Sequence, residues 1–404
     1  MEWENISTTF FPVNLTEIDV IDVAGDDASV VEKLYLYITI ILVSLCCVSV
    51  AVNVTILLSV CWIRRPISPT LHISLSLAGS DLWSNTLIGI ALIFNSLLPV
   101  VYHIHPLSIC QLLVLEAFRM AGMYTTSGHL LALAGNHYLG IRKPLQYPAL
   151  MTMRYICVIE VLLWVVPPVS FITYFSVIAD DGFSVAECDF KFMIHTEFRS
   201  VCSYIFLGSL VLMAAIYIHI YLLVRKHQAN RNKFRRAGST YSRSSQMAEN
   251  HQNQRRNEKA LCTTLLIVGS MLLGWLPATI YFYFVCEDCL VPRNWGTPVW
   301  RIITNFILNF LLILKTAINS YIYAARMKEI KDAMRKMRNN LVIVCCLIGH
   351  RDMNGHSSTA SRHFVSRTSM RSSKRTVLYR MNSIPRIDQP KAKANDQYSH
   401  PTQL

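Results

Sequence analysis

The chain has 404 residues, of which 52% are hydrophobic and only 16% are charged. Soluble domains carry about 25% charged residues, so this composition argues against a soluble globular protein. The net charge of +13 would suit a nucleic-acid-binding protein. However, the basic residues gather in short segments between apolar blocks, so no nucleic-acid partner is expected.

Seven apolar blocks follow one another along the chain, and each is longer than the ~20 residues that a helix needs to cross a bilayer. The backbone must satisfy its own hydrogen bonds within lipid, so these blocks are predicted to be helices. The fold class is therefore an all-α membrane protein, a seven-transmembrane helix bundle over 34–325. The predicted spans are about 34–62, 69–98, 109–139, 153–178, 199–224, 260–285 and 300–325.

The distribution of charge predicts the orientation in the membrane. Residues 1–33 are acidic, whereas basic residues follow the first, third, fifth and seventh spans. The positive-inside rule then predicts a multi-pass plasma-membrane protein with an extracellular N-terminal segment and a cytoplasmic C-terminus. Asn5 and Asn14 begin Asn-X-Ser/Thr sequences in that outer segment, so we expect both to be glycosylated.

Three polar segments are expected on the cytoplasmic side. Residues 226–257 have few apolar side chains and are predicted to form a disordered third loop. Basic and apolar residues alternate over 327–341 at helical spacing, which predicts an amphipathic helix on the membrane lipids. The tail, 342–404, is rich in Ser and Thr. Cys345 and Cys346 are candidate palmitoylation sites or, alternatively, unmodified cysteines in an apolar patch.

Four cysteines are expected on the outer side, where the environment is oxidising. Cys110 opens the third span, and Cys188 lies in the loop after the fourth. Cys286 and Cys289 bracket a Glu-Asp pair at the outer end of the sixth. We expect a Cys110–Cys188 disulfide and a second, short Cys286–Cys289 disulfide, although the sequence leaves open whether the short one forms.

Each span also carries a short residue pattern. The patterns are Asn53 in the first span, Leu77-Ala78-Gly79-Ser80-Asp81 in the second, Asn136-His137-Tyr138 in the third, Trp164 in the fourth, Tyr217 in the fifth, Gly274-Trp275-Leu276-Pro277 in the sixth and Asn319-Ser320-Tyr321-Ile322-Tyr323 in the seventh. In this order they resemble the rhodopsin-like (class A) G-protein-coupled receptors, with divergent motifs, over about 34–340.

The resemblance implies a cell-surface receptor that converts binding of an extracellular ligand into activation of a heterotrimeric G protein. Arrestin and receptor kinases would act on the Ser/Thr-rich tail. No enzymatic activity, catalytic residue, metal or cofactor is implied. Pro277 would kink the sixth span into a hinge. The implied switch and G-protein interface comprises Asn136, His137, Tyr138, Tyr217, Pro277, Asn319 and Tyr323.

Two departures from the family pattern concern this switch. Asn136-His137 replaces Asp-Arg, and Asn257 stands where the acidic partner on the sixth span is usually found. The cytoplasmic ionic latch therefore looks absent, which implies either basal activity or altered coupling. Ser320 replaces a proline, so the seventh span keeps a backbone donor and is expected to be straighter.

Lys315 is a cation in the middle of the seventh span, where an unpaired charge costs several kcal/mol. The opsins carry a retinal-binding lysine in this span, but that position here is Ile313, about 200° around the helix. Asp81 is equally isolated in the second span, and in the family this aspartate binds Na⁺. We expect an Asp81–Lys315 pair with Lys315 as an internal cation; the alternative is a Lys315 that faces a wet cavity.

The expected ligand pocket lacks the signature of biogenic-amine receptors, because the third span contains no Asp. Arg119 would receive a carboxylate or phosphate of an acidic ligand. Alternatively, it pairs with Glu116 one turn before it. The other predicted pocket residues are Met120, Met123, Trp275, Phe282 and Asn309.

Other classes remain open at this point. A ligand-independent, constitutively signalling receptor fits the same sequence. A transporter is disfavoured because no inverted repeat is apparent, and a retinal protein is disfavoured by the register of Lys315. The sequence does not identify the ligand.

Overall fold

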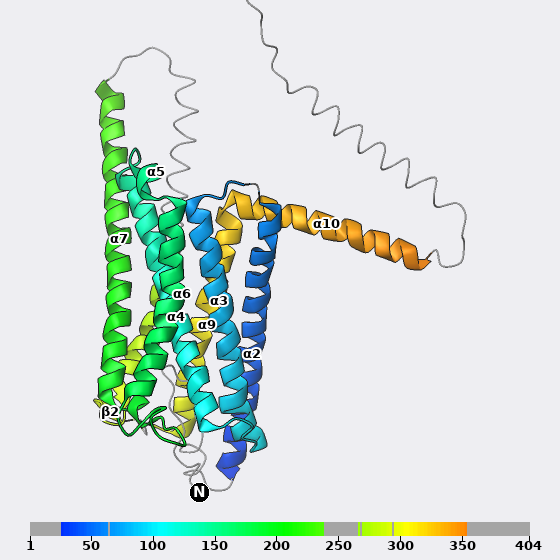
Figure 1. Ribbon diagram of the computed structural model, residues 1–404, viewed down its shortest axis with the longest axis vertical. Helices are drawn as coiled ribbons and strands as arrows, with labels where there is room; N and C mark the ends of the chain where they lie inside the picture. Colours follow the sequence, from blue (N-terminus) through cyan, green and yellow to red (C-terminus); the bar gives the residue numbers. More distant parts are fainter. Residues whose placement is uncertain (1–25, 64, 238–265, 267–268, 293–294, 354–404) are drawn as a thin grey trace, which may run out of the picture. The chain divides into compact units, whose positions relative to one another are not determined.

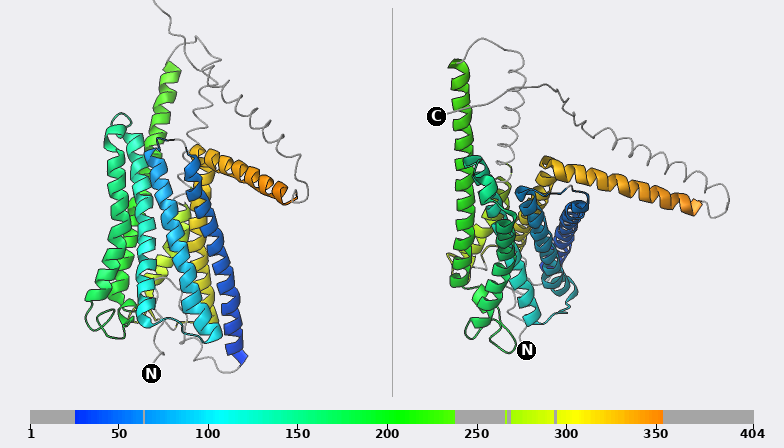
Figure 2. Two further views of the ribbon diagram at one scale, coloured as in Figure 1. Left: turned by 45° about the vertical axis from the view of Figure 1, so that its right-hand side comes forward. Right: turned by 45° about the horizontal axis from the view of Figure 1, so that its top comes forward.

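The computed structural model describes residues 26–63, 65–237, 266, 269–292 and 295–353. The chain divides into one unit up to Arg338 and a second unit from Asn339 onward. The long helices of the first unit are α2 (Asp26–Ser59), α3 (Pro69–Leu92), α4 (Ile109–Arg142), α6 (Met153–Val177), α7 (Thr196–Ala237), the helical residues 269–284, and α9 (Pro298–Arg326). They run side by side as a bundle (Figures 1 and 2).

The all-α bundle predicted from the apolar blocks is confirmed. Among the described residues, five helices are long and apolar enough to cross a membrane: Val30–Trp62, Pro69–Val101, Met153–Val177, Thr196–Lys226 and Pro298–Ile322. α4 is as long as these, at 34 residues. It is less apolar because it contains Glu116, Arg119 and several Thr, Ser and His side chains. Its polarity suits its position, since α4 packs against α3, α6 and α7.

Two helix starts follow from local capping. Ser68 precedes α3 and accepts a hydrogen bond from the backbone N–H of Leu71, and Pro69 fits the first turn, where no donor is needed. Ser108 precedes α4 and forms a capping box with Gln111. These polar side chains satisfy backbone groups that the first helical turn leaves unpaired.

Several helix ends differ from the prediction. α3 passes at Ile93 into a π-helix, η2 (Ile93–Val101), which contains Pro99. Proline cannot donate an α-helical hydrogen bond, which accounts for the irregular winding. α7 continues to Ala237, well into the predicted disordered loop. The surface helix expected over 327–341 extends as α10 (Lys328–Met353). The rest of the loop and the tail beyond 353 lie outside the described residues.

The loop between α6 and α7 is held by backbone hydrogen bonds to one carboxylate. The side chain of Asp181 accepts from the backbone N–H of Gly182 at 2.7 Å and of Phe192 at 2.6 Å. Gly182 also pairs with Asp189 as an isolated antiparallel bridge. These contacts fold the loop back against the bundle, where Phe192 and Met193 become buried.

Gly182 is required in this loop for two reasons. Its φ is +62°, and a Cβ atom there would lie 2.3 Å from the carbonyl oxygen of Phe175. We predict that Gly182→Ala lowers the free energy of unfolding by at least about 1–3 kcal/mol, the usual cost of a strained backbone position. Thermal unfolding of the purified protein measures this. Gly135→Ala is the control, because no atom lies within 4 Å of its added Cβ; equal effects of the two changes would contradict the prediction.

Candidate functional site

The centre of the bundle contains a buried cation. Lys315 lies in α9 and is 1% exposed. Its Nζ atom lies 3.9 Å from Oδ1 of Asp81 on α3 and 3.8 Å from the centroid of the Trp275 ring. The first separation is an ion-pair distance but too long for a direct hydrogen bond. The second is a cation–π contact. The buried ammonium therefore faces a negative carboxylate on one helix and an aromatic face on another.

Gly274, next to Trp275, allows the close approach of Lys315. A Cβ atom at Gly274 would lie 2.5 Å from Cβ and 2.9 Å from Cγ of Lys315. Both atoms belong to the inner part of the lysine side chain, which cannot move without moving α9. The glycine therefore permits the contact between α9 and the helical residues 269–284.

Polar side chains from α2, α3 and α9 surround the pair. Asn319 donates to Oδ2 of Asp81 at 3.3 Å, and Asn85 donates to Oγ1 of Thr316 at 2.8 Å. Ser320 donates to Oδ1 of Asn53 at 2.7 Å. All of these residues are buried. Ser320 stands where the family pattern has proline, so its hydroxyl connects α9 to α2, a connection that proline could not make.

The predicted acidic-ligand site at Arg119 is already occupied by a neighbouring side chain. Nε of Arg119 donates to Oε2 of Glu116 at 2.7 Å, and a second ion pair joins the guanidinium to Oε1. Both side chains are 1% exposed. This bidentate pair is the second of the two interpretations drawn from the sequence. It neutralises both charges within one turn of α4.

The other predicted pocket residues lie inside the bundle. Met120, Met123, Trp275, Phe282 and Asn309 are all buried. Asn309 donates to the backbone carbonyl of Asn305 one turn earlier in α9. Trp275 receives the edge of Phe206, with ring centroids 4.9 Å apart. Phe206 did not figure in the sequence prediction, because nothing in an apolar span distinguishes one phenylalanine from its neighbours.

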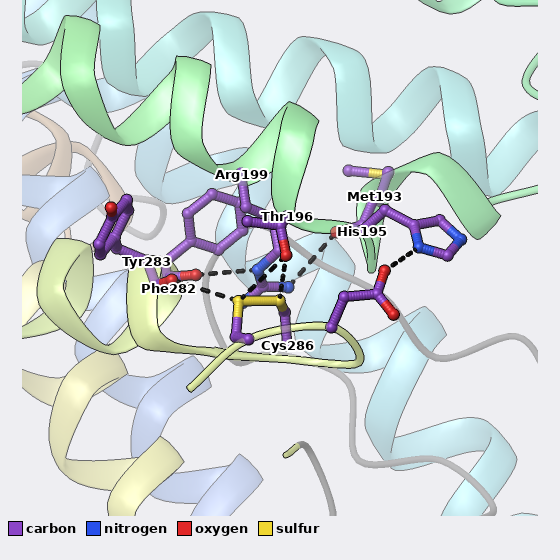
Figure 3. The surroundings of a disulfide bond; sticks show 9 residues. Met193, His195, Thr196, Arg199, Phe282, Tyr283 and Cys286 are labelled. Atoms are coloured by element: carbon purple, nitrogen blue, oxygen red, sulfur yellow. Dashed lines mark hydrogen bonds and ion pairs between the residues drawn. A yellow bond between two sulfur atoms is a disulfide. The ribbon is translucent and has the colours of Figure 1, made fainter. Parts of the chain in front are cut away.

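Phe282 is covered by an arginine that the sequence did not single out. The guanidinium of Arg199 lies 3.9 Å from the Phe282 ring centroid, and its Nε donates to the Phe282 carbonyl at 2.8 Å (Figure 3). A second, longer bond reaches the carbonyl of Met193 in the loop. Arg199 thus joins the start of α7 to the end of the helical residues 269–284.

Both expected disulfides are present at this end of the bundle, which we call the disulfide end. Cys110 is bonded to Cys188, which ties the start of α4 to the loop after α6. Cys286 is bonded to Cys289, in the short segment where β1 (Val285–Cys286) pairs with β2 (Val291–Pro292) (Figure 3). The disulfide end is at the bottom of Figure 1.

The opposite end of α4 carries the altered Asn136-His137-Tyr138 motif. Asn136 donates to Oγ1 of Thr70 at 2.8 Å and accepts from the hydroxyl of Tyr147 at 2.8 Å. Tyr147 begins the short helix α5 (Tyr147–Leu150). The amide therefore links α3, α4 and α5 without a charge. Within the described part of the chain, no ion pair includes the half-buried His137.

Of the remaining switch residues, Tyr217 and Pro277 lie within the described part of the chain, whereas the side chain of Tyr323 does not. Tyr217 is 2% exposed, and its hydroxyl has no hydrogen-bond partner among the described residues. Pro277 lies within the helical residues 269–284, near the buried Trp275. Outside the described residues lie Asn5, Asn14, Asn257 and the side chains of Tyr323, Cys345 and Cys346.

A bundle of long apolar helices with a buried charge pair at its centre and disulfides at one end is the architecture of a multi-pass membrane protein. The sequence profile described as 7 transmembrane receptor (rhodopsin family) matches residues 52–323. The chain therefore belongs to the rhodopsin family of seven-transmembrane receptors, which are signalling receptors of the plasma membrane and not enzymes. The family resemblance drawn from the seven motifs is confirmed.

Individual relatives are more distant. The 5-hydroxytryptamine receptor 4 of Rattus norvegicus is 28% identical over 158 residues, 38% of this chain and 36% of that receptor. The same receptor of Homo sapiens is also 28% identical over 158 residues, 38% of this chain and 37% of its own. The octopamine receptor beta-1R of Drosophila melanogaster is 23% identical over 244 residues, 53% of this chain and 44% of that receptor. The chain thus aligns with less than half the length of these relatives.

A double-mutant cycle tests the central pair. Lys315→Met leaves the Asp81 carboxylate without its cation, and we predict a loss of about 3–5 kcal/mol in stability. Combining it with Asp81→Asn should recover part of that loss, so that the two effects are clearly non-additive in thermal or denaturant unfolding. The matched control is Asp332–Arg335, an ion pair of the same 3.9 Å separation that is exposed. Its coupling should be close to zero; additivity at the buried pair would contradict the assignment.

The disulfide end contains an ion pair, His195–Asp288, that is expected to respond to pH. Nδ1 of His195 lies 2.5 Å from Oδ2 of Asp288, and this hydrogen bond raises the pKa of His195 above its ordinary value of 6.5. A raised pKa in the folded state means that the contact stabilises the fold below about pH 6.5. That contribution is lost as the pH rises through the folded-state pKa.

We therefore predict that hydrogen exchange in residues 285–292, corrected for the intrinsic rate, is slower at pH 6 than at pH 8.5. His195→Ala should remove the difference. A corrected exchange rate that is the same at both pH values in the unmodified receptor would show that the ion pair does not hold this segment.

Proposed function

We propose that this receptor converts binding of an extracellular ligand at its disulfide end into activation of a heterotrimeric G protein at the opposite end. Membership of the rhodopsin family supports this assignment. The acidic first 33 residues and the basic segments after alternate spans support the orientation. Oxidation of all four cysteines is consistent with an extracellular disulfide end.

The observation that carries the proposal is the contact of Lys315 with both Asp81 and Trp275. A receptor needs two packings of similar free energy that a ligand can bias. Lys315 in α9 contacts one side chain on α3 and another beside Pro277, so any outward movement of the residues around Trp275 alters its surroundings. We infer that Lys315 acts as an internal cation in the place where related receptors bind Na⁺.

The ligand proposed for this receptor is not a classical biogenic amine. The relatives are named for 5-hydroxytryptamine and octopamine. Glu116 is the one carboxylate of α4, and its two oxygens already bind Arg119. An ammonium ligand would have to displace that buried guanidinium and leave it unpaired, which is costly.

Nucleotide exchange on a purified heterotrimeric G protein tests the function directly. The full-length receptor in lipid nanodiscs should accelerate exchange, and 5-hydroxytryptamine and octopamine should not increase the rate further. Replacing NaCl by choline chloride should also leave the rate and the thermal stability unchanged, because the cation is covalently part of the chain. Stimulation by either amine would refute the ligand assignment, and a Na⁺ effect would refute the internal cation.

A ligand-independent receptor is a second candidate, favoured by the loop at the disulfide end. Phe192 and Met193 of this loop are 5% and 1% exposed. The Phe192 ring lies edge-on to Phe175 and Phe198, with centroids 4.9 and 5.2 Å apart. Side chains of the loop thus make contacts within the bundle of the kind that a bound ligand would make.

His137 supplies a prediction for either candidate. Asn136 is neutral and His137 has no ion pair among the described residues, so we expect the resting state to be weakly held and agonist-free exchange to be measurable. A guanidinium reaches further than an imidazole toward G-protein carbonyl groups. His137→Arg should therefore raise the maximal exchange rate on the order of severalfold.

The measurement is GTP turnover at matched surface expression, with His105→Arg as the control for added positive charge at the exposed disulfide end. Absent basal turnover together with an unchanged or lower maximum in His137→Arg would show that the G-protein interface is built around histidine.

A further inference from the structure

An apolar crevice of about 370 Å³ lies between α6 and α7, in the half of each helix nearer the disulfide end. None of the six predicted pocket residues lines it. The rings of Tyr124, Phe171, Tyr174 and Phe198 form much of its wall, with Val201 and Ile205 at its rim. Its volume falls within the ~300–1,000 Å³ typical of small-molecule sites.

The crevice results from how three helices pack. The backbones of α6 and α7 each lie along α4 but not along each other. Their side chains meet where Tyr174 of α6 stacks on Phe198 of α7, with ring centroids 5.4 Å apart, and α4 forms the floor of the gap beside this contact. Tyr124 of α4 lies on that floor, and its hydroxyl donates to the carbonyl of Cys202 at 2.7 Å. This bond spans from α4 to α7 and fixes the ring in place.

Two consecutive prolines lie in α6 beside the crevice. Pro167 and Pro168 lie within the helix, and neither can donate a backbone hydrogen bond. The carbonyl of Leu163, which Pro167 would otherwise bond, accepts instead from Oγ1 of Thr125 at 3.1 Å. α6 is thus attached to α4 just below the crevice by a side-chain bond to a carbonyl that the helix itself leaves free.

The crevice opens away from the bundle. Val201 and Ile205 are 58% and 59% exposed, and Val166 on the facing helix is 51% exposed. All three lie within helices apolar enough to span the membrane. We infer that the hydrocarbon of the bilayer, not water, covers the opening. Among the described residues that line the crevice none is charged, so a charged molecule would find no partner among them.

We propose that this crevice binds an uncharged, ring-containing lipophilic molecule that enters from the bilayer. Aromatic side chains favour edge and offset contacts with other rings, beyond the gain from buried area. A flexible alkyl chain would lose rotational freedom without making such contacts. The site is distinct from the proposed extracellular ligand pocket, and its binding does not require G-protein coupling.

The crevice also lies close to the receptor core. The Tyr124 ring is 5.5 Å from the Phe206 ring, and Phe206 is 4.9 Å from Trp275, which covers Lys315. Two edge-on ring contacts therefore separate the floor of the crevice from the residue that holds the buried cation.

Photolabelling tests the proposal with a defined probe, 4-hexylbenzophenone, which is uncharged, ring-containing and photoreactive. The full-length receptor in phosphatidylcholine nanodiscs is labelled, and modified peptides are mapped by mass spectrometry. We expect saturable labelling of residues 166–174 and 198–205. Excess diphenylmethane should compete, whereas hexadecane at the same membrane concentration should not.

Ile205→Trp fills the rim of the crevice and should weaken this labelling about tenfold. Val211→Trp is the matched control, because Val211 is 68% exposed on the same helix and does not line the crevice. Both changes lie on the lipid-facing surface, so neither should prevent folding. Labelling that does not saturate, that hexadecane displaces equally, or that survives in Ile205→Trp would show only ordinary contact with bulk lipid and would overturn the proposal.

Discussion

The packing of this receptor's core depends on a buried positive charge that, as a lysine side chain, is covalently attached to the chain. Lys315 is 1% exposed in the middle of α9, where an unpaired ammonium would cost several kcal/mol. Its neighbours come from two other helices: the carboxylate of Asp81 in α3, and Gly274 with the ring face of Trp275 in the helical residues 269–284. A change in the packing of any of these helices changes the solvation of one charge.

The departures from the family pattern become consistent once this charge is in place. Ser320 binds Asn53, and Asn319 binds Asp81, so α9 is joined to α2 and α3 by hydrogen bonds. Asn136 likewise retains a link from α4 to α3 and α5 through neutral bonds to Thr70 and Tyr147. Ser320 and Asn136, two of the altered motif residues, therefore still join helices. At these positions the links between helices are kept without a charge.

The sequence predicts those features that depend on local spacing or on a large energetic penalty. The seven apolar blocks gave the helices, and isolated intramembrane charges gave the Asp81–Lys315 pair. The i,i+3 spacing made Glu116 a partner for Arg119.

Contacts that depend on how helices rotate against each other were not predictable. Ser320 with Asn53 and Phe206 with Trp275 are examples, since each joins residues far apart in the chain. The crevice between α6 and α7 has no sequence signature, because it is the space that two helices leave when both pack on α4. The extension of α7 to Ala237 was missed because a polar, solvated helix and a disordered loop have similar compositions.

A tethered cation also changes the energetics of switching. A diffusible ion can leave when its site is rearranged, so its binding free energy depends on its concentration. The Lys315 ammonium stays, so each packing of the bundle must solvate it. If the residues around Trp275 move outward, the cation–π contact is lost, at a cost of about 2 kcal/mol for a desolvated pair, while the contact with Asp81 on α3 is retained. A difference of that size is enough to leave the second packing as a minor population that modest differential binding can make dominant.

Tyr124 and Phe206 extend this argument to the membrane side of the receptor, because they connect the apolar crevice to the same tryptophan. The indole ring of Trp275 therefore contacts the buried charge directly and the crevice through Phe206 and Tyr124.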